Sequence, residues 1–205
     1  MAGPFLVRKV IRTHCTFVNN RMKLRLVHFR AILASVGIGL VALAAQTPAL
    51  ADIPPEPLAK RIDKPVLLGQ AEYRFLGRPM YLAQYYAPED GQQPDFVPSG
   101  LELTYLRAFS AGLLAWASMA ELRRLEGEPA DHTDFEAGLR SCFSDVSEGD
   151  RYLALAKSAD DLELWLNGKQ VCTISGARWS ERFLSIWLSE NARDPRLARV
   201  LKGID

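Results

Sequence analysis

The last third of the chain changes its hydrophobic period within a short stretch. Residues 161–166 alternate polar and apolar side chains, which is typical of a half-buried β-strand. Asn167 and Gly168 follow and both accept a positive φ, so they predict a two-residue hairpin turn into a returning strand over residues 169–174. Beyond Gly176 apolar side chains recur at helical spacing, as Trp179, Phe183, Ile186 and Trp187. We therefore predict an antiparallel hairpin followed by an amphipathic helix.

The rest of the chain adds four strands and three helices to this prediction. Apolar and polar positions predict a hairpin around Gly77, from strands over residues 66–76 and 79–87, and further strands over 101–107 and 151–157. Helices are predicted over residues 110–125, 133–146 and 194–201. Strands and helices are grouped rather than alternating, which favours an α+β fold with a mainly antiparallel sheet backed by helices on one face.

The N-terminal region has the pattern of an export signal. A short apolar run over residues 31–45 follows basic residues, and Ala49 and Ala51 are the small residues expected around a cleavage site before Asp52. The run is short for a membrane span, although an uncleaved anchor is the alternative. Met22 begins a conventional signal by itself, so the start is either Met1 or Met22, and in the second case residues 1–21 are a mis-assigned start. We expect a periplasmic or secreted protein.

Three regions follow from that expectation. Residues 1–51 form the signal peptide, cleaved after Ala51; residues 52–64, rich in proline, form an extended linker; residues 65–205 form one domain. Residues 1–51 hold seven Lys/Arg and no acid, so the remainder has 18 basic and 24 acidic residues, a formal charge of −6. An acidic chain is a poor partner for nucleic acid and for anionic membrane surfaces.

Few residues suited to catalysis remain after residue 51. His132 is the one histidine there, and Thr133 and Glu136 beside it have capping-box spacing, so we interpret it as a residue at the start of a helix rather than a catalytic base. No cluster has metal-ligand spacing, and no glycine-rich phosphate loop follows a strand. We expect no cofactor, although an apolar cleft is compatible with a tetrapyrrole.

Two cysteines remain after residue 51, and in an exported chain they are candidates for a disulfide. Cys142 shares a helical face with apolar residues and is expected to point into the core. The hairpin register about the Asn167–Gly168 turn places Val171 under the helices and Cys172 on the opposite face, with Trp165 and Ile174. A disulfide needs Cα atoms within about 7 Å and converging Cβ vectors, so we expect two free thiols.

The order of these motifs resembles the bacterial chalcone isomerase-like family. The matching features are Gly149-Asp150, the Asn167-Gly168 hairpin, Gly176, the run over residues 183–188 and the closing Leu201-Lys202-Gly203. Residues 69–77 and 80–87 are similar to the first hairpin of that family. Ser189 departs from the pattern, because the family usually has glycine there. The resemblance implies an open-faced sandwich with a ligand cleft between sheet and helices.

The resemblance also implies a ligand site on the first hairpin. In chalcone isomerases an arginine on this strand polarises the substrate oxygen during a ring-closing addition. In related fatty-acid-binding proteins the corresponding arginine and a nearby tyrosine hold a carboxylate. Arg74 is the matching position here, with Tyr81, Tyr85 or Tyr86 as its companion. A guanidinium group suits a carboxylate because it donates two parallel hydrogen bonds.

The residues alone leave the role of Arg74 open. Gln70, Glu72 and Arg74 alternate along one strand face, which equally suits a solvated outer face with cross-strand pairs. A loop over residues 77–79 sets Glu72 opposite Gln84, and a loop one residue shorter sets Arg74 opposite Tyr81. Six aromatic residues either line the cleft or belong to the plain core: Phe109, Trp116, Trp165, Trp179, Phe183 and Trp187.

Three functions are compatible with these observations. The first is a secreted, non-catalytic protein that binds a small apolar or carboxylated ligand, such as a fatty acid. The second is an intramolecular lyase, an isomerase that uses Arg74 as the electrophile; the threonine that such enzymes carry on the second strand falls near Ala83 or Gln84, which leaves one arginine to stabilise the developing anion. The third is an accessory partner in a complex of the cell envelope.

Overall fold

The sheet of this protein arranges its six strands in chain order, and every neighbouring pair is antiparallel. The computed structural model describes residues 53–89 and 96–204, so the expected export segment lies outside the described residues. The strands are β1 (Pro65–Phe75), β2 (Arg78–Pro88), β3 (Ser99–Tyr105), β4 (Arg151–Ala156), β5 (Asp161–Leu166) and β6 (Lys169–Ser175). No helix within the described ranges is long and apolar enough to cross a membrane.

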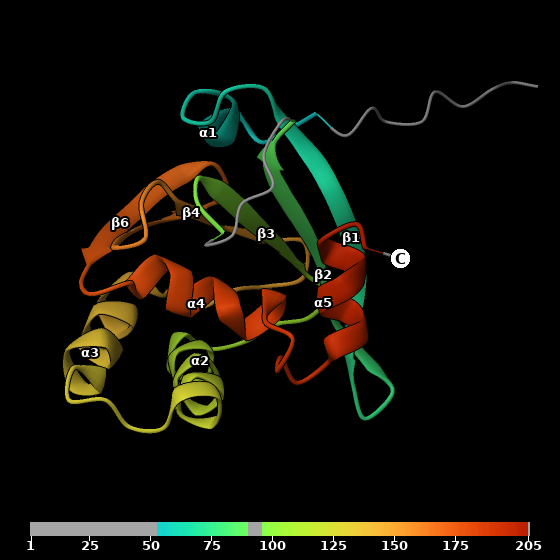
Figure 1. Ribbon diagram of the computed structural model, residues 1–205. Helices are drawn as coiled ribbons and strands as arrows, with labels where there is room; N and C mark the ends of the chain where they lie inside the picture. The colour runs from blue at the N-terminus through green and yellow to red at the C-terminus, as the bar shows by residue number, and fades with distance from the viewer. Residues whose placement is uncertain (1–52, 90–95, 205) are drawn as a thin grey trace, which may run out of the picture. The chain divides into compact units, whose positions relative to one another are not determined.

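The helices divide between the two faces of the sheet. Figure 1 shows α2 (Ala111–Glu126), α3 (His132–Cys142) and α4 (Trp179–Leu188) on one face. The last helix, α5 (Pro195–Leu201), packs against β1. On the other face lies the single turn α1 (Glu56–Ala59). The α+β arrangement predicted from the grouping of strands and helices is confirmed.

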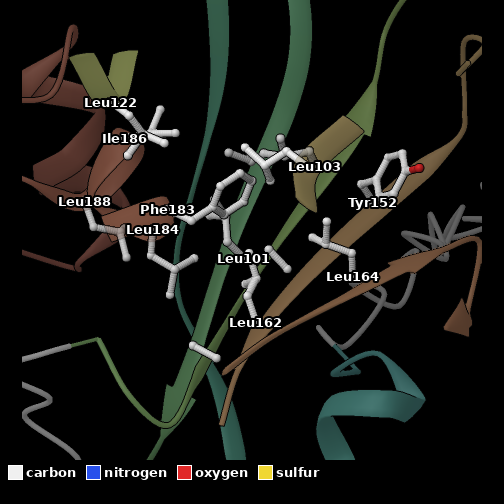
Figure 2. Close-up of a cluster of buried hydrophobic side chains, with 14 of the residues drawn as sticks. Leu101, Leu103, Leu122, Tyr152, Leu162, Leu164, Phe183, Leu184, Ile186 and Leu188 are labelled. Carbon is white, nitrogen blue, oxygen red and sulfur yellow. The ribbon is translucent and has the colours of Figure 1, made fainter. Parts of the chain in front are cut away.

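The main hydrophobic core lies between the sheet and the three large helices (Figure 2). Leu101, Leu162 and Leu164 of the sheet meet Phe183 and Leu184 of α4, and all five are buried. Each such side chain stabilises the fold by about 1.5–3 kcal/mol through removal of its apolar surface from water. The helical spacing of α4 therefore serves to place one apolar face against the sheet.

A second, smaller core corrects the prediction of an extended linker over residues 52–64. Leu58 of α1 and Ile62 are buried against Tyr86 and Leu155 on the outer face of the sheet. Pro57 has no backbone N–H, but backbone N–H groups in the first turn of a helix have no partner within the helix. A proline at this position therefore costs no hydrogen bond, and the proline-rich segment can form a helical turn. The domain thus begins before residue 65.

The two hairpins that were predicted form with the same turn geometry. Asn167 and Gly168 have φ of 50° and 78°, and Leu76 and Gly77 have φ of 49° and 77°. The two-residue turn at Leu76 pairs Phe75 with Arg78, and an irregularity follows at Tyr73. The first hairpin therefore has neither of the two expected registers: Gln84 lies opposite Gln70 rather than Glu72, and Arg74 lies opposite Pro79 rather than Tyr81.

The second helix predicted from the sequence, over residues 133–146, differs from α3 at both ends. Helix α3 begins at His132, with Asp131 as the N-cap, so the capping box expected at Thr133 is absent. It ends at Cys142, and Val146 instead forms an isolated bridge with Phe109.

The expectation of two free thiols is wrong, because Cys142 and Cys172 form a disulfide with a Cα–Cα distance of 5.5 Å. A bulge between Leu164 and Trp165 adds one residue to β6, so Leu164 pairs with Cys172 rather than with Val171. The bulge exchanges the faces of the following residues: Val171 is 39% exposed, while Cys172 points toward the helices. The disulfide joins the end of α3 to β6.

Candidate functional site

A cavity of about 490 Å³ lies between the sheet and helices α2 and α4. Leu101, Leu103 and Tyr152 belong to its sheet side, and Phe183 and Ile186 belong to its helix side. Most of its lining is aromatic or aliphatic. Its size is within the range of about 300–1,000 Å³ that is usual for small-molecule sites.

Small side chains leave this space unfilled. Ala154 lies at the centre of β4, where a large side chain would reach across the layer to the helices. Ala117, Ser118 and Ala120 of α2 line the same cavity. Protein interiors are normally close-packed, so a gap that small side chains of the sheet and of α2 help to leave open points to a space that a ligand fills.

Polar groups meet at one end of the cavity, where β1 and β2 approach α4. Trp187 donates its indole N–H to the Tyr81 hydroxyl at 2.9 Å. The Tyr81 ring stacks on Tyr73, with ring centroids 5.1 Å apart. Burial raises the pKa of the Tyr81 phenol well above its usual range, although the hydrogen bond from Trp187 opposes that shift. Tyr81 is therefore a neutral phenol that accepts one bond and has its own proton left to donate.

A cation lies beside these tyrosines. Arg193, in the segment that joins α4 to α5, lines the cavity and forms an ion pair through Nε with Glu121. The other carboxylate oxygen of Glu121 accepts from Nε of Arg124 at 2.8 Å. Tyr73 lines the same cavity, and burial raises the pKa of its phenol, while the positive charge of Arg193 opposes that rise. The carboxylates of Glu121 and Asp194 also line the cavity here, so an anionic ligand group would have to compete with Glu121 for the Arg193 guanidinium.

The structure separates the residues that the sequence grouped as a ligand site. Arg74 is exposed, pairs with Glu72 at 2.7 Å and donates to the carbonyl of Gly77 at 3.1 Å, and it does not line the cavity. Tyr81 does line it. Tyr85 is buried in the main core without reaching the cavity, and Tyr86 belongs to the small core on the other face.

The aromatic residues divide between the two predicted roles. Phe109, Trp116, Phe183 and Trp187 line the cavity. Trp179 instead stacks on Phe135 in the core, with ring centroids 4.7 Å apart and nearly parallel planes.

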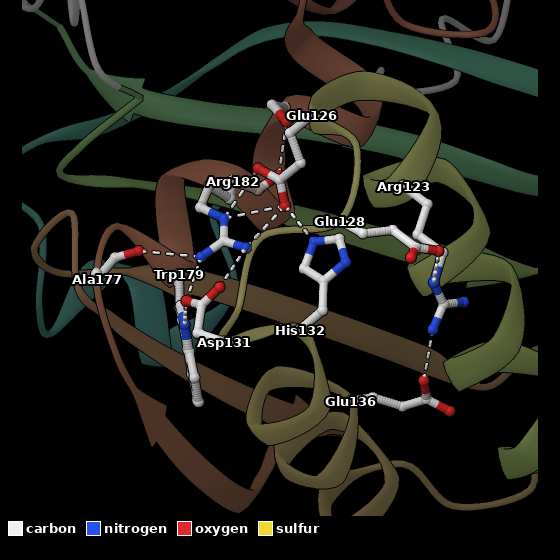
Figure 3. Close-up of polar contacts among 10 residues, drawn as sticks. Arg123, Glu126, Glu128, Asp131, His132, Glu136, Ala177, Trp179 and Arg182 are labelled. Carbon is white, nitrogen blue, oxygen red and sulfur yellow. Dashed lines mark hydrogen bonds and ion pairs between the residues drawn. The ribbon is translucent and has the colours of Figure 1, made fainter.

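A second polar cluster holds the helices together away from the cavity (Figure 3). Arg182 of α4 lies between Glu126 and Asp131, with N–O distances of 2.8 and 2.6 Å. His132 is buried, and its Nε2 lies 2.8 Å from the same Glu126 carboxylate. The hydrogen bonds from Arg182 and Trp179 lower the pKa of Asp131 to about 2. These contacts join the α2–α3 connection to α4, which accords with a structural role for His132.

Sequence reasoning missed Arg193, the arginine at the cavity. It lies in the segment between α4 and α5 and precedes Asp194, whose side chain caps α5 by accepting from the backbone N–H of Leu197 at 3.0 Å. The sequence did predict a short helix that begins at Asp194. The position of Arg193 relative to the cavity depends on how α4 packs on the sheet. No local sequence pattern predicts this packing. Within the described ranges no group of three or more His, Cys, Asp or Glu is placed to hold a metal.

Comparison with known proteins identifies the family. A family model described as chalcone isomerase-like matches residues 97–203, just over half of the chain. The protein belongs to the chalcone isomerase-like family. The match includes β3 to β6 and the helices that cover them, and hence most of the cavity lining.

A solved structure shows the same chalcone isomerase fold. A fatty-acid binding protein of Arabidopsis thaliana superposes with a TM-score of 0.51 over 69% of this chain and 88% of that protein, at 12% sequence identity. At that identity the likeness establishes the architecture alone. No curated protein matches the sequence.

Proposed function

We propose that this protein is exported and binds a fatty acid, or a similar long-chain carboxylic acid, in the cavity without transforming it. The observation that carries the proposal is the largely apolar cavity of about 490 Å³, whose lining includes Arg193 and the contacting pair Tyr73 and Tyr81. Transfer of each methylene group from water to such a site contributes about 0.8 kcal/mol, so an alkyl chain supplies most of the affinity. The fatty-acid binding activity of a protein with the same fold supports this class of ligand.

Arg193 takes the place that the family resemblance gave to Arg74. It is the arginine that lines the cavity, and Tyr73 and Tyr81 lie at the same end. A ligand carboxylate replaces Glu121 as the partner of the Arg193 guanidinium and accepts the free proton of the Tyr81 hydroxyl. Its alkyl chain then extends between the sheet and α4, past Ala154.

The disulfide supports export. Disulfides persist in oxidising compartments and are rare where thiols are kept reduced. The bond between Cys142 and Cys172 therefore agrees with the signal pattern over residues 1–51, which rests on the sequence alone.

The first experiment asks what the cavity holds. Native mass spectrometry of the protein from its own cell envelope is expected to show a co-purified long-chain acid. A fluorescent fatty acid is expected to bind the purified chain and to be displaced by unlabelled acid. Ala117→Phe and Ala154→Phe are expected to abolish this binding because they fill the space, whereas Ala177→Phe, on an exposed loop, leaves it unchanged.

Two results would contradict the proposal. Fatty-acid binding that survives both cavity-filling changes would place the ligand elsewhere. Measurable cyclisation of a chalcone, lost in Ala154→Phe, would show instead that the cavity performs the intramolecular addition of the isomerase alternative.

A further inference from the structure

Exposed apolar side chains surround the mouth of the cavity. Trp116 is 60% exposed and Leu113 45% exposed on α2, and Phe75 is 47% exposed at the end of β1. All three also line the cavity, so they mark its opening. Leu76, next to Phe75 at the tip of the β1–β2 hairpin, is 87% exposed. We call these four residues the mouth patch. In Figure 1 the hairpin projects past α5 at the lower edge of the sheet.

Turn chemistry does not account for Leu76. Leu76 and Asn167 begin turns of the same geometry, with φ of 49° and 50° and a following glycine in each. Such turns favour asparagine, which the β5–β6 hairpin has, and a leucine at positive φ carries a steric cost. Leu76 also buries almost none of its side chain within the chain. An apolar side chain in this place is explained by a surface outside the chain that covers it.

Basic side chains flank the patch. Arg74 and Arg78 stand on either side of the hairpin tip, and Arg107 lies beside Met80, a residue that lines the cavity. Arg74 is already paired with Glu72, whereas within the described ranges no ion pair involves Arg78 or Arg107. Apolar and aromatic side chains flanked by arginines fit the boundary between acyl chains and phosphate groups of a lipid bilayer.

The size of the patch disfavours a second copy of the chain as the occupant. A stable protein–protein interface buries about 800 Å² on each partner. Four partly exposed side chains offer only a few hundred Å², which is an ordinary size for the largest apolar patch on a monomer. Insertion into a bilayer needs less area because lipid conforms to each side chain.

We propose that the mouth patch docks on the surface of a phospholipid bilayer, so that the cavity opens toward the acyl chains. The proposal rests on the proposed function in one respect, since a lipid-derived ligand then passes between membrane and cavity without crossing water. The charge of −6 beyond residue 51 opposes attraction to strongly anionic surfaces. The driving force is therefore apolar insertion, with the phosphates of zwitterionic lipids meeting Arg78 and Arg107.

Tryptophan fluorescence tests this docking directly. All four tryptophans lie after residue 52, and Trp116 is the most exposed of them. The processed chain, which begins at Asp52 and lacks the apolar N-terminal stretch, is mixed with phosphatidylcholine vesicles whose acyl chains carry bromine, which quenches nearby indoles. We expect quenching that persists at high salt and that is lost in Trp116→Phe.

A matched pair of changes tests the hairpin tip. Leu76→Asn gives the first turn the residues of the second, so its melting temperature is expected to be equal or higher, while the vesicle concentration for half-maximal quenching rises about tenfold or more. Val171→Asn replaces an apolar residue on β6, outside the cavity lining, and is expected to leave quenching unchanged.

Two outcomes would overturn the docking proposal: absence of quenching of Trp116, or equal quenching of the wild type and Leu76→Asn. If the wild type forms a concentration-dependent dimer and Leu76→Asn dissociates it, the patch binds a second copy of the chain rather than a membrane. Displacement of fluorescent fatty acid in vesicle-free solution is expected to be the same for the wild type and Leu76→Asn. Failure of ligand binding and failure of docking are thus separate results.

Discussion

Trp187 donates its indole N–H to the hydroxyl of Tyr81 at 2.9 Å, which joins α4 to β2 at the cavity wall. Tyr81→Phe removes the acceptor and leaves the indole N–H without its partner. The free energy of unfolding is expected to fall by about 1–2 kcal/mol in a denaturant titration. Tyr73→Phe is the matched control, since its hydroxyl makes no hydrogen bond within the described residues, and it is expected to change stability by less than about 0.5 kcal/mol. Equal losses in both variants would contradict this account.

Arg193 is expected to determine the preference for an acid. Arg193→Ala should weaken fatty-acid binding by about 1.5–3 kcal/mol, the range for a hydrogen bond to a charged group, and Arg193→Lys should restore little because an ammonium group lacks the planar fork. Binding of the methyl ester of the same acid should be equal in all three proteins. Arg196→Ala, an exposed arginine on α5 that does not line the cavity, is the control for charge. If Arg74→Ala strongly weakens fatty-acid binding, the carboxylate binds at Arg74 on β1 and not at Arg193.

The disulfide is expected to contribute stability and to be present in the native protein. The loop that it closes spans 30 residues, and loss of such a bond lowers the free energy of unfolding by about 3 kcal/mol. The double change Cys142→Ser and Cys172→Ser should show this loss in a denaturant titration. Thiol titration of the unfolded, non-reduced chain should find neither cysteine reactive. Two reactive thiols would show that the register of β6 differs from the bulged one.

Stability is expected to depend on pH through Asp131. Its pKa of about 2 in the folded state lies below the usual 3.8, so its stabilisation is complete above about pH 4 and is lost as the pH falls through about 2. Asp131→Asn should lower the free energy of unfolding by about 1–2 kcal/mol at pH 7, with the difference from the wild type vanishing near pH 2. A constant difference across that range would assign the effect to packing.

Local chemistry made much of the fold predictable. Asn167 and Gly168 specify a turn by themselves, and the spacing from Trp179 to Trp187 specifies a helix with one apolar face. Both predictions were confirmed. The Leu164–Trp165 bulge was not predictable, because both possible registers of β6 place some apolar side chains under the helices. The wrong prediction of two free thiols follows from the one residue that the bulge adds to β6, because it changes the face on which Cys172 lies.

The site was harder to predict than the fold. The alternation of Gln70, Glu72 and Arg74 showed that they share a face, but it did not show which face, and the structure exposes it. Ala117 of α2 and Ala154 of β4 line the same cavity only because the helices pack over the sheet as they do. Residues that are far apart in sequence and small in size give no periodic signal.

The chain-ordered sheet divides the molecule into two local meanders, β1–β3 and β4–β6, which residues 106–150 separate. Each meander closes only short loops, whereas pairing of β3 with β4 closes a long one and is expected to limit the folding rate. The cavity floor straddles this seam, with Leu103 on one side and Tyr152 directly opposite. A bound ligand therefore acts as a clamp across the two halves, and amide hydrogen exchange along β3 and β4 should slow most when the cavity is filled.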